Sequence, residues 1–224
     1  MTFKRGAVLG AATLGLWASI VAVGPTPAAA QAAPAIAPRQ TQADDYTRYE
    51  LLDPASASFR ILYEVTATTV GAKYFWNPIR KGSIASNESV SDPTNGKALK
   101  FTEVSGTEAR ANGFPEAELD TRYIQIELPR TVPKEGEIRL LIDKTYKDEK
   151  SYFTEETTGY IVFSRSLGIK RNSVVLPVGY EVVACNFPSQ VVSEAGTGGA
   201  RLRMSFMNIG PDAVSYVVKA RRVK

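Results

Sequence analysis

Residues 123–128, YIQIEL, decide the fold class, because their apolar and polar side chains alternate. A period of two places Ile124, Ile126 and Leu128 on one face of a β-strand and the two polar side chains on the other. Apolar, β-branched and aromatic runs of strand length recur in residues 59–66, 138–142, 160–163, 173–176, 180–185, 201–206 and 214–220. The sequence therefore predicts a protein built almost entirely of short β-strands.

Turn-forming residues separate these runs, in residues 92–96 (DPTNG), 112–113 (NG), 133–136 (PKEG), 196–199 (GTGG) and 210–212 (GPD). No run is followed by a helical pattern long enough for a crossover between parallel strands. Together these features favour an all-β fold, an antiparallel β-sandwich over residues 46–224. Within it, Leu202, Met204 and Phe206 are expected in the core, and Arg201 and Arg203 in solvent.

The first thirty residues have the three parts of a signal peptide. Lys4 and Arg5 form the positive start, residues 6–23 are apolar, and Ala28-Ala29-Ala30 supplies small side chains for a signal peptidase. We expect cleavage after Ala30. An uncleaved membrane anchor is the alternative, since about 18 apolar residues just span a bilayer. Residues 31–45 are rich in Gln, Ala, Pro and Thr, and we expect them to form a short flexible linker.

The composition excludes several classes of catalytic site. The chain has no histidine and one cysteine, so it forms neither a Ser-His-Asp or Cys-His nucleophile nor a four-cysteine zinc site. We expect no catalytic residue, no metal, no cofactor and no enzymatic activity. Cys185 lies in an apolar run and is expected to be a buried structural thiol.

The charge balance gives little support to nucleic acid as a partner. Of the 27 basic and 23 acidic residues, residues 1–30 contain two basic residues and no acidic one. The expected mature chain is therefore nearly balanced in charge. Binding to nucleic acid needs a concentrated basic face, which the sequence does not show.

The best candidate for a binding site lies in residues 73–81, KYFWNPIRK. Tyr74, Phe75 and Trp76, flanked by Arg80 and Lys81, combine aromatic faces with cations, which together stack on sugars, bases or peptide side chains. Three consecutive aromatic residues of a strand cannot share one face, so at least one is expected to point outward. The alternative is that the aromatic residues belong to the core, with the loop of residues 84–99 folded over them.

Four segments carry a resemblance to a known family: residues 49–54 (YELLDP), 59–65 (FRILYEV), 128–137 (LPRTVPKEGE) and 178–183 (VGYEVV). They resemble the all-β N-terminal domain of secreted zinc aminopeptidases, in which a strand leads into a Pro-x-x-Gly-Glu-type turn. The catalytic H-E-x-x-H helix of that family is absent from the chain. The resemblance therefore implies a β-sandwich accessory domain without the catalytic domain, and no active-site residue is carried over.

These observations predict an exported protein, periplasmic or extracellular, without a membrane span once the signal peptide is removed. We expect a non-catalytic β-sandwich that binds a protein or a cell-envelope component. Two alternatives remain open: an exported hydrolase that acts through paired carboxylates, and a structural or scaffold subunit. Acids clustered in a concave pocket would favour the hydrolase, and an exposed aromatic patch would favour binding.

Overall fold

The computed structural model describes residues 39–223. The expected signal peptide, its cleavage site and residues 31–38 of the expected linker lie outside the described residues. Strand β1 (Gln42–Leu51) begins inside the expected linker, before the predicted start of the domain at residue 46. It does so because Gln42 and Ala43 already pair with Ala67 and Thr66 of β2 (Ser58–Ala67).

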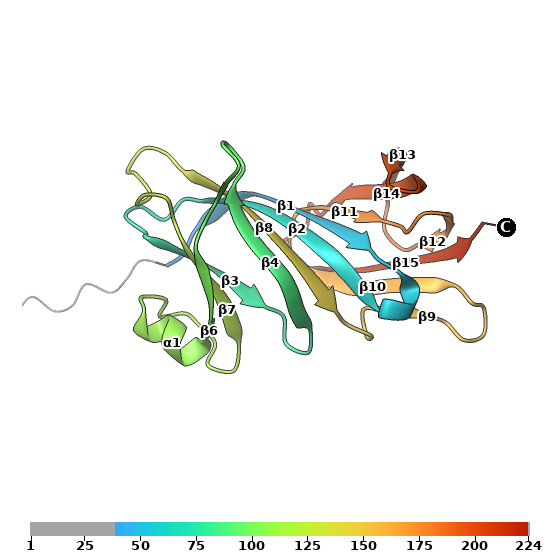
Figure 1. The fold of residues 1–224 in the computed structure, drawn as a ribbon, viewed down its shortest axis with the longest axis horizontal. Helices are drawn as coiled ribbons and strands as arrows, with labels where there is room; N and C mark the ends of the chain where they lie inside the picture. The colour runs from blue at the N-terminus through green and yellow to red at the C-terminus, as the bar shows by residue number, and fades with distance from the viewer. Residues whose placement is uncertain (1–38, 224) are drawn as a thin grey trace, which may run out of the picture. The chain divides into compact units, whose positions relative to one another are not determined.

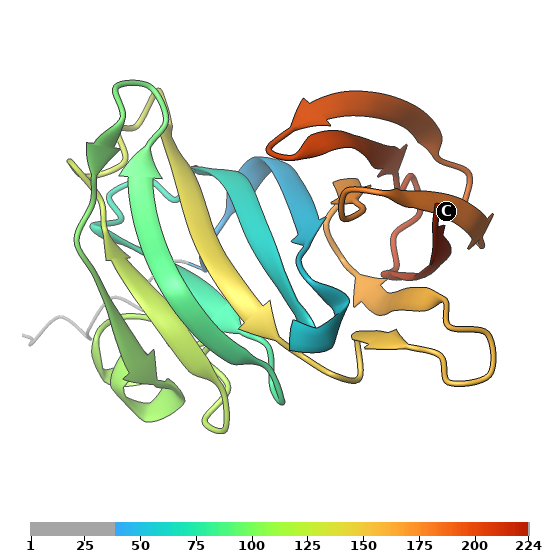
Figure 2. The same ribbon diagram turned by 45° about the vertical axis from the view of Figure 1, so that its right-hand side comes forward.

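The strands form three sheets, and the prediction of an all-β fold is confirmed (Figure 1). The largest sheet has the order β13-β14-β11-β1-β2-β8-β4-β5, and Figure 2 shows β4, β8 and β2 side by side in green, yellow and cyan. Besides β1 and β2 it contains β4 (Ile84–Asp92), β5 (Lys97–Ala98), β8 (Ile138–Lys147), β11 (Arg171–Val175), β13 (Gln190–Gly196) and β14 (Gly199–Met207).

Two smaller sheets and two short helices complete the described fold. The sheet β12-β15-β10-β9 consists of β9 (Tyr152–Thr154), β10 (Ile161–Leu167), β12 (Tyr180–Cys185) and β15 (Val214–Arg222). The sheet β3-β7-β6 consists of β3 (Tyr74–Ile79), β6 (Phe101–Ser105) and β7 (Arg122–Glu127). The helices are η1, a 3₁₀ turn (Pro54–Ser56), and α1 (Gly106–Ala111).

One pair of strands departs from the predicted antiparallel arrangement. β1 and β11 run parallel, with Tyr46 opposite Arg171 and Glu50 opposite Val175. Parallel neighbours need a long connection, and here the connection is the whole stretch from β2 to β10. Turn residues predict pairing only between strands that are consecutive in the chain, so they could not predict the pairing of β1 with β11.

The core is shared by the three sheets, as a sandwich requires. One continuous cluster of buried apolar side chains draws Phe59 from β2, Leu140 from β8, Phe163 from β10, Ile124 from β7 and Met204 from β14. A second, smaller cluster lies around Trp76 beneath α1. Cys185 is half-buried at the end of β12 and donates to the carbonyl oxygen of Phe187 at 3.2 Å.

The predicted alternation in β14 is confirmed on one face and needs correction on the other. Met204 and Phe206 are buried, and Leu202 is half-buried against the core. Arg201 and Arg203 are not free in solvent, since their side chains are only 18% and 34% exposed. Arg203 pairs with Glu194 of the neighbouring β13, and Arg201 pairs with Glu50 of β1, two strands away in the large sheet. A charged side chain on this face is therefore covered by its partners.

Helix α1 was not predicted, although the sequence carries its signal. Ser105 and Glu108 form a capping box: the Ser105 hydroxyl accepts from the Glu108 amide at 3.2 Å, and the Glu108 carboxylate accepts from the Ser105 amide at 2.7 Å. The first residue of the helix is Gly106, and only a glycine fits at this position, because an added Cβ would lie 2.0 Å from the carbonyl oxygen of Glu118. The loop that follows α1 thus packs directly on the helix backbone.

Candidate functional site

Strand β3 divides the three predicted aromatic residues between two environments. Phe75 is buried in the main core, and Trp76 is buried in the smaller cluster. Tyr74 is 39% exposed, and its ring centre lies 6.1 Å from that of Trp76. At least one aromatic side chain therefore points outward, as the alternation of a strand requires.

Trp76 is covered by a different part of the chain from the one considered in the sequence. Phe114, in the loop after α1, stacks on Trp76 with ring centres 5.6 Å apart and an interplanar angle of 4°. Residues 84–99 do not form a covering loop, because residues 84–92 are strand β4, which pairs with β8. The alternative of a loop of residues 84–99 folded over the aromatic residues is therefore wrong.

The backbone of β3 has a free edge, which one side chain closes in part. β3 is the last strand of its sheet and pairs only with β7. The side-chain amide of Gln40 accepts from the Trp76 amide at 2.8 Å and donates to the Trp76 carbonyl at 3.0 Å. These two bonds replace one rung of a β-ladder. Pro78 has no N–H to offer, so Tyr74 and Trp76 carry the backbone groups of this edge.

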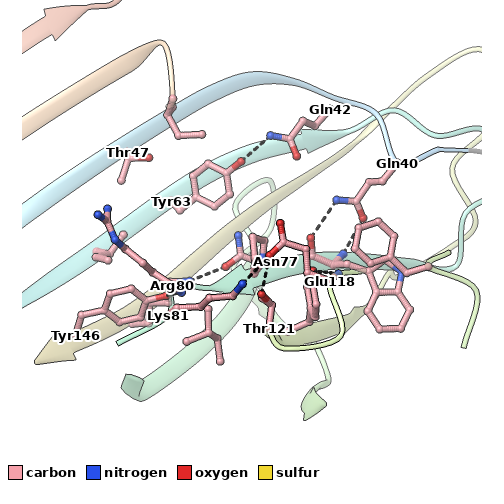
Figure 3. Close-up of a pocket in the computed structure, with 18 of the residues that line it drawn as sticks. Gln40, Gln42, Thr47, Tyr63, Asn77, Arg80, Lys81, Glu118, Thr121 and Tyr146 are labelled. Atoms are coloured by element: carbon pink, nitrogen blue, oxygen red, sulfur yellow. Dashed lines mark hydrogen bonds and ion pairs between the residues drawn. The ribbon is translucent and has the colours of Figure 1, made fainter. Parts of the chain in front are cut away.

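A cavity of about 700 Å³ lies along this edge of β3. Figure 3 shows Gln42, Thr47 and Tyr63, from β1 and β2, on one side of it, and Asn77 and Thr121 on the other. The volume falls in the range of small-molecule sites. The inner walls are mostly aromatic and aliphatic and come from β1, β2, β3 and β8: Tyr49, Ile61, Tyr63, Ile79 and Tyr146.

The two predicted basic residues lie at the mouth of this cavity, and they are not equivalent. Lys81 is exposed, but its amine lies 2.8 Å from Asp120 and 3.1 Å from Glu118, and these carboxylates raise its pKa. Arg80 is exposed and donates to the carbonyl oxygen of Ser166 at 3.2 Å. Among residues 39–223 no carboxylate pairs with Arg80. The charge of Arg80 is therefore the one open to a ligand at the mouth.

Lys144 is the feature of the cavity that the sequence analysis missed. It follows Ile138, Leu140 and Ile142 at the next inward position of β8, so a cation occupies a core-facing position. Its side chain lines the cavity, and the residue is 4% exposed. The alternation of residues 138–142, extended by two positions, places residue 144 on the inward face.

The amine of Lys144 has one hydrogen-bond partner within the described residues. It donates to the side-chain oxygen of Asn77 at 2.6 Å, which links β8 to β3. Burial lowers the pKa of Lys144 from its ordinary value of 10.5 to about 8, and the charge of Glu88 offsets this only in part. An ammonium group has three donors, so two of them have no hydrogen-bond acceptor among residues 39–223, although the amine lies over the Tyr146 ring at 5.0 Å from its centre.

Arg165 also lines the cavity, but its charge is already paired. Its guanidinium lies 3.1 Å from the Asp148 carboxylate and donates to the Ser151 hydroxyl at 3.2 Å. It also stacks over the rings of Phe59 and Tyr146, at 5.2 and 5.6 Å from their centres. This arrangement makes Arg165 a structural link between β10 and the loop after β8.

The two carboxylates that line the cavity both lie at its mouth and are both ion-paired. Glu116 pairs with Arg39 at 3.2 Å, and Glu118 pairs with Lys81, which lowers the pKa of Glu118. A general acid needs a raised pKa instead.

Within residues 39–223 no group of three or more His, Cys, Asp or Glu is arranged to hold a metal ion. In the same part of the chain, no helix is both long and apolar enough to cross a bilayer.

The comparisons with known proteins find similarity in structure alone. The sequence matches no protein family and no curated protein. Among solved structures, an M1 zinc metallopeptidase from Deinococcus radiodurans matches with a TM-score of 0.47 and 10% identity, covering 79% of this chain and 40% of that chain. An aminopeptidase N family protein from Idiomarina loihiensis matches with a TM-score of 0.46 and 13% identity, covering 79% and 29%.

These structures are of the enzyme class that the sequence segments resemble. The chain spans about two fifths or less of their length. Their names describe an M1 zinc metallopeptidase and an aminopeptidase N family protein, and at these TM-scores no residue role passes from them to this chain.

Proposed function

We propose that this chain is an exported, non-catalytic binding protein that recognises an anionic protein surface or cell-envelope polymer with β3 and the mouth of the adjacent cavity. The recognition residues are Tyr74, Arg80 and Lys81. Phe75 and Trp76 hold β3 in place from the core side and from beneath Phe114. The observation that supports this proposal most is Arg80, an exposed cation without a carboxylate partner among residues 39–223.

Three properties of the surface support the proposal together. Tyr74 offers an exposed aromatic face for stacking. The β3 edge offers backbone groups to an extended chain wherever Gln40 does not occupy them. Of the four cations that line the cavity, Lys81 and Arg165 are ion-paired, and Arg80 and Lys144 have no carboxylate partner among residues 39–223. A negatively charged partner complements this surface.

At the cavity along β3, the geometry favours binding over the carboxylate-dependent hydrolase. Such a hydrolase needs two carboxylates facing a substrate cleft, one of them with a raised pKa. The two glutamates at the cavity are engaged in ion pairs, and Lys81 lowers the pKa of Glu118. No observation on the described residues favours the scaffold alternative.

A titration with poly-L-glutamate tests the proposal. The chain has two tryptophans, and Trp17 lies in the expected signal peptide, so the mature chain keeps Trp76 as its single tryptophan reporter. We expect saturable binding that weakens as salt is added. Arg80→Ala should weaken binding by about tenfold, equivalent to about 1.4 kcal/mol.

The matched control is Arg130→Ala. Arg130 is also exposed and also donates to a backbone carbonyl, that of Glu137 at 3.4 Å, but it does not line the cavity. This control should bind poly-L-glutamate as the parent chain does. Equal losses in the Arg80 and Arg130 variants would show non-specific charge attraction and remove the proposed recognition surface.

A further inference from the structure

We propose that the cavity along β3 binds a small monocarboxylate with an apolar body, and that the amine of Lys144 holds the carboxylate. Lys144 is buried inside the cavity, whereas the recognition residues Arg80 and Lys81 line the same cavity at its exposed mouth, so the two sites share the cavity and use different residues. It does not depend on the partner proposed above.

The first argument is the unmet hydrogen-bonding capacity of Lys144. Lys144 is 4% exposed, and its single hydrogen-bond partner within residues 39–223 is the amide oxygen of Asn77. A buried ammonium with two unused donors is costly. Glu88 acts on Lys144 only through its charge and forms no ion pair with it, whereas a carboxylate in the adjacent space supplies a direct ion pair and the acceptor oxygens for the unused donors.

The second argument is the charge that the ligand must carry. Arg165 is already paired with Asp148, so Lys144 is the one buried cation of the cavity that is free of an ion pair. A single negative charge balances it. A dianion such as a phosphate monoester would bring a second charge into the same buried space without a second free cation beside it. The site therefore favours a carboxylate.

The third argument is the chemistry of the remaining wall. Around Lys144 the cavity is lined by Tyr49, Ile61, Ile79 and Tyr146, whose side chains offer aliphatic and aromatic surface. A volume of about 700 Å³ exceeds what a small ion such as acetate fills. Apolar walls with a few placed polar groups are typical of sites for amphipathic ligands. We infer an apolar body attached to the carboxylate.

Octanoate and 1-octanol are matched probes for this site. They share the apolar chain, and only octanoate carries the charge. In the mature chain, octanoate should change the Trp76 emission in a saturable way, because Trp76 also lines the cavity. The alcohol should bind at least about tenfold more weakly, since it cannot pair with the ammonium. Equal affinity for acid and alcohol, or no saturable change with octanoate, would overturn the inference.

Two lysines of β8 provide the matched variants. Lys144→Met should weaken octanoate binding by at least about tenfold and leave octanol binding nearly unchanged. Lys147→Met is the control, because Lys147 lies on the same strand, is exposed and does not line this cavity. It should bind octanoate as the parent does. The comparison of octanoate with octanol needs neither variant, so it tests whether the cavity prefers a carboxylate even where Lys144→Met does not fold.

The outcomes separate this inference from the proposed function. Loss of poly-L-glutamate binding in Arg80→Ala with octanoate binding intact supports two distinct sites. Absence of octanoate binding in a chain that still binds poly-L-glutamate through Arg80 removes the carboxylate site and leaves the proposed function. Binding of octanoate in a chain that does not bind poly-L-glutamate removes the proposed function and leaves the carboxylate site.

Discussion

Replacing Lys144 by methionine should stabilise the folded chain at neutral pH. The two side chains are both unbranched and of similar length, so the change removes the charge without leaving a large cavity. Lys144 is almost fully buried, and its charge faces Glu88 and Arg165, one attractive and one repulsive. Because burial lowers the pKa of Lys144, the protonated lysine opposes folding.

The magnitude follows from the pKa. A change from 10.5 in the unfolded chain to about 8 in the folded chain corresponds to a cost of about 3 kcal/mol below pH 8, where the lysine is protonated in both states. The methionine variant avoids this cost but leaves the Asn77 oxygen without its partner, which costs about 1–2 kcal/mol. The net gain in the free energy of unfolding at pH 7 is therefore about 1–2 kcal/mol.

The sign of the pH dependence is fixed by which state binds the proton. Between pH 8 and 10.5 the unfolded chain keeps the lysine proton and the folded chain releases it, so the stability of the parent chain rises with pH. By pH 9.5 about 2 kcal/mol of the cost is relieved. The advantage of Lys144→Met should therefore fall to about zero or below between pH 7 and pH 9.5.

Urea unfolding at pH 7 and pH 9.5 measures both effects. Three chains are compared: the parent, Lys144→Met and the exposed control Lys147→Met, which should differ from the parent by under about 0.5 kcal/mol at either pH. The reasoning is refuted if Lys144→Met is less stable than the parent at pH 7. It is equally refuted if the difference between the two chains is the same at both pH values.

Three further predictions concern packing and processing. Phe206→Ala should lower the free energy of unfolding in urea by roughly 3–5 kcal/mol, because Phe206 is buried. Met207→Ala, on the exposed face, should lower it by under about 0.5 kcal/mol, and equal losses would mean a wrong register for β14. Gly106→Ala should lower the melting temperature, because the new methyl group would lie 2.0 Å from a backbone oxygen. Gly168→Ala should leave it unchanged, because no atom lies within 4 Å of the added methyl group. An unchanged melting temperature in Gly106→Ala would contradict the close packing at the start of α1. Mass spectrometry of the exported protein should find Gln31 as the N-terminus, and an intact first methionine would refute cleavage.

The parts of the fold that follow from local pattern were predictable from the sequence. Alternation in residues 123–128 identified β7, and the inward positions of Met204 and Phe206 in β14 followed from the same rule. Alternation also predicted that at least one of the three aromatic residues points outward, and the structure identifies it as Tyr74. Each of these predictions depends only on side chains within one strand.

The parts that depend on distant segments were not predictable in the same way. Phe114 covers Trp76 from a loop that lies 38 residues further along the chain. Lys81 meets its carboxylates, among them Asp120, only after the fold brings them together. Lys144 is an intermediate case. Its inward position follows from the alternation of β8, but its single hydrogen-bond partner within the described residues, Asn77, comes from another sheet.

Photo-crosslinking from position 74 in the exported protein tests the proposed recognition surface most directly. A photoreactive phenylalanine analogue replaces Tyr74, and in a parallel chain it replaces Lys97, an exposed residue that does not line the cavity. We predict a discrete crosslinked product from position 74 that disappears when Arg80 is changed to alanine, and no such product from position 97. The same products from both positions, or a product from position 74 that persists without Arg80, would contradict the proposal.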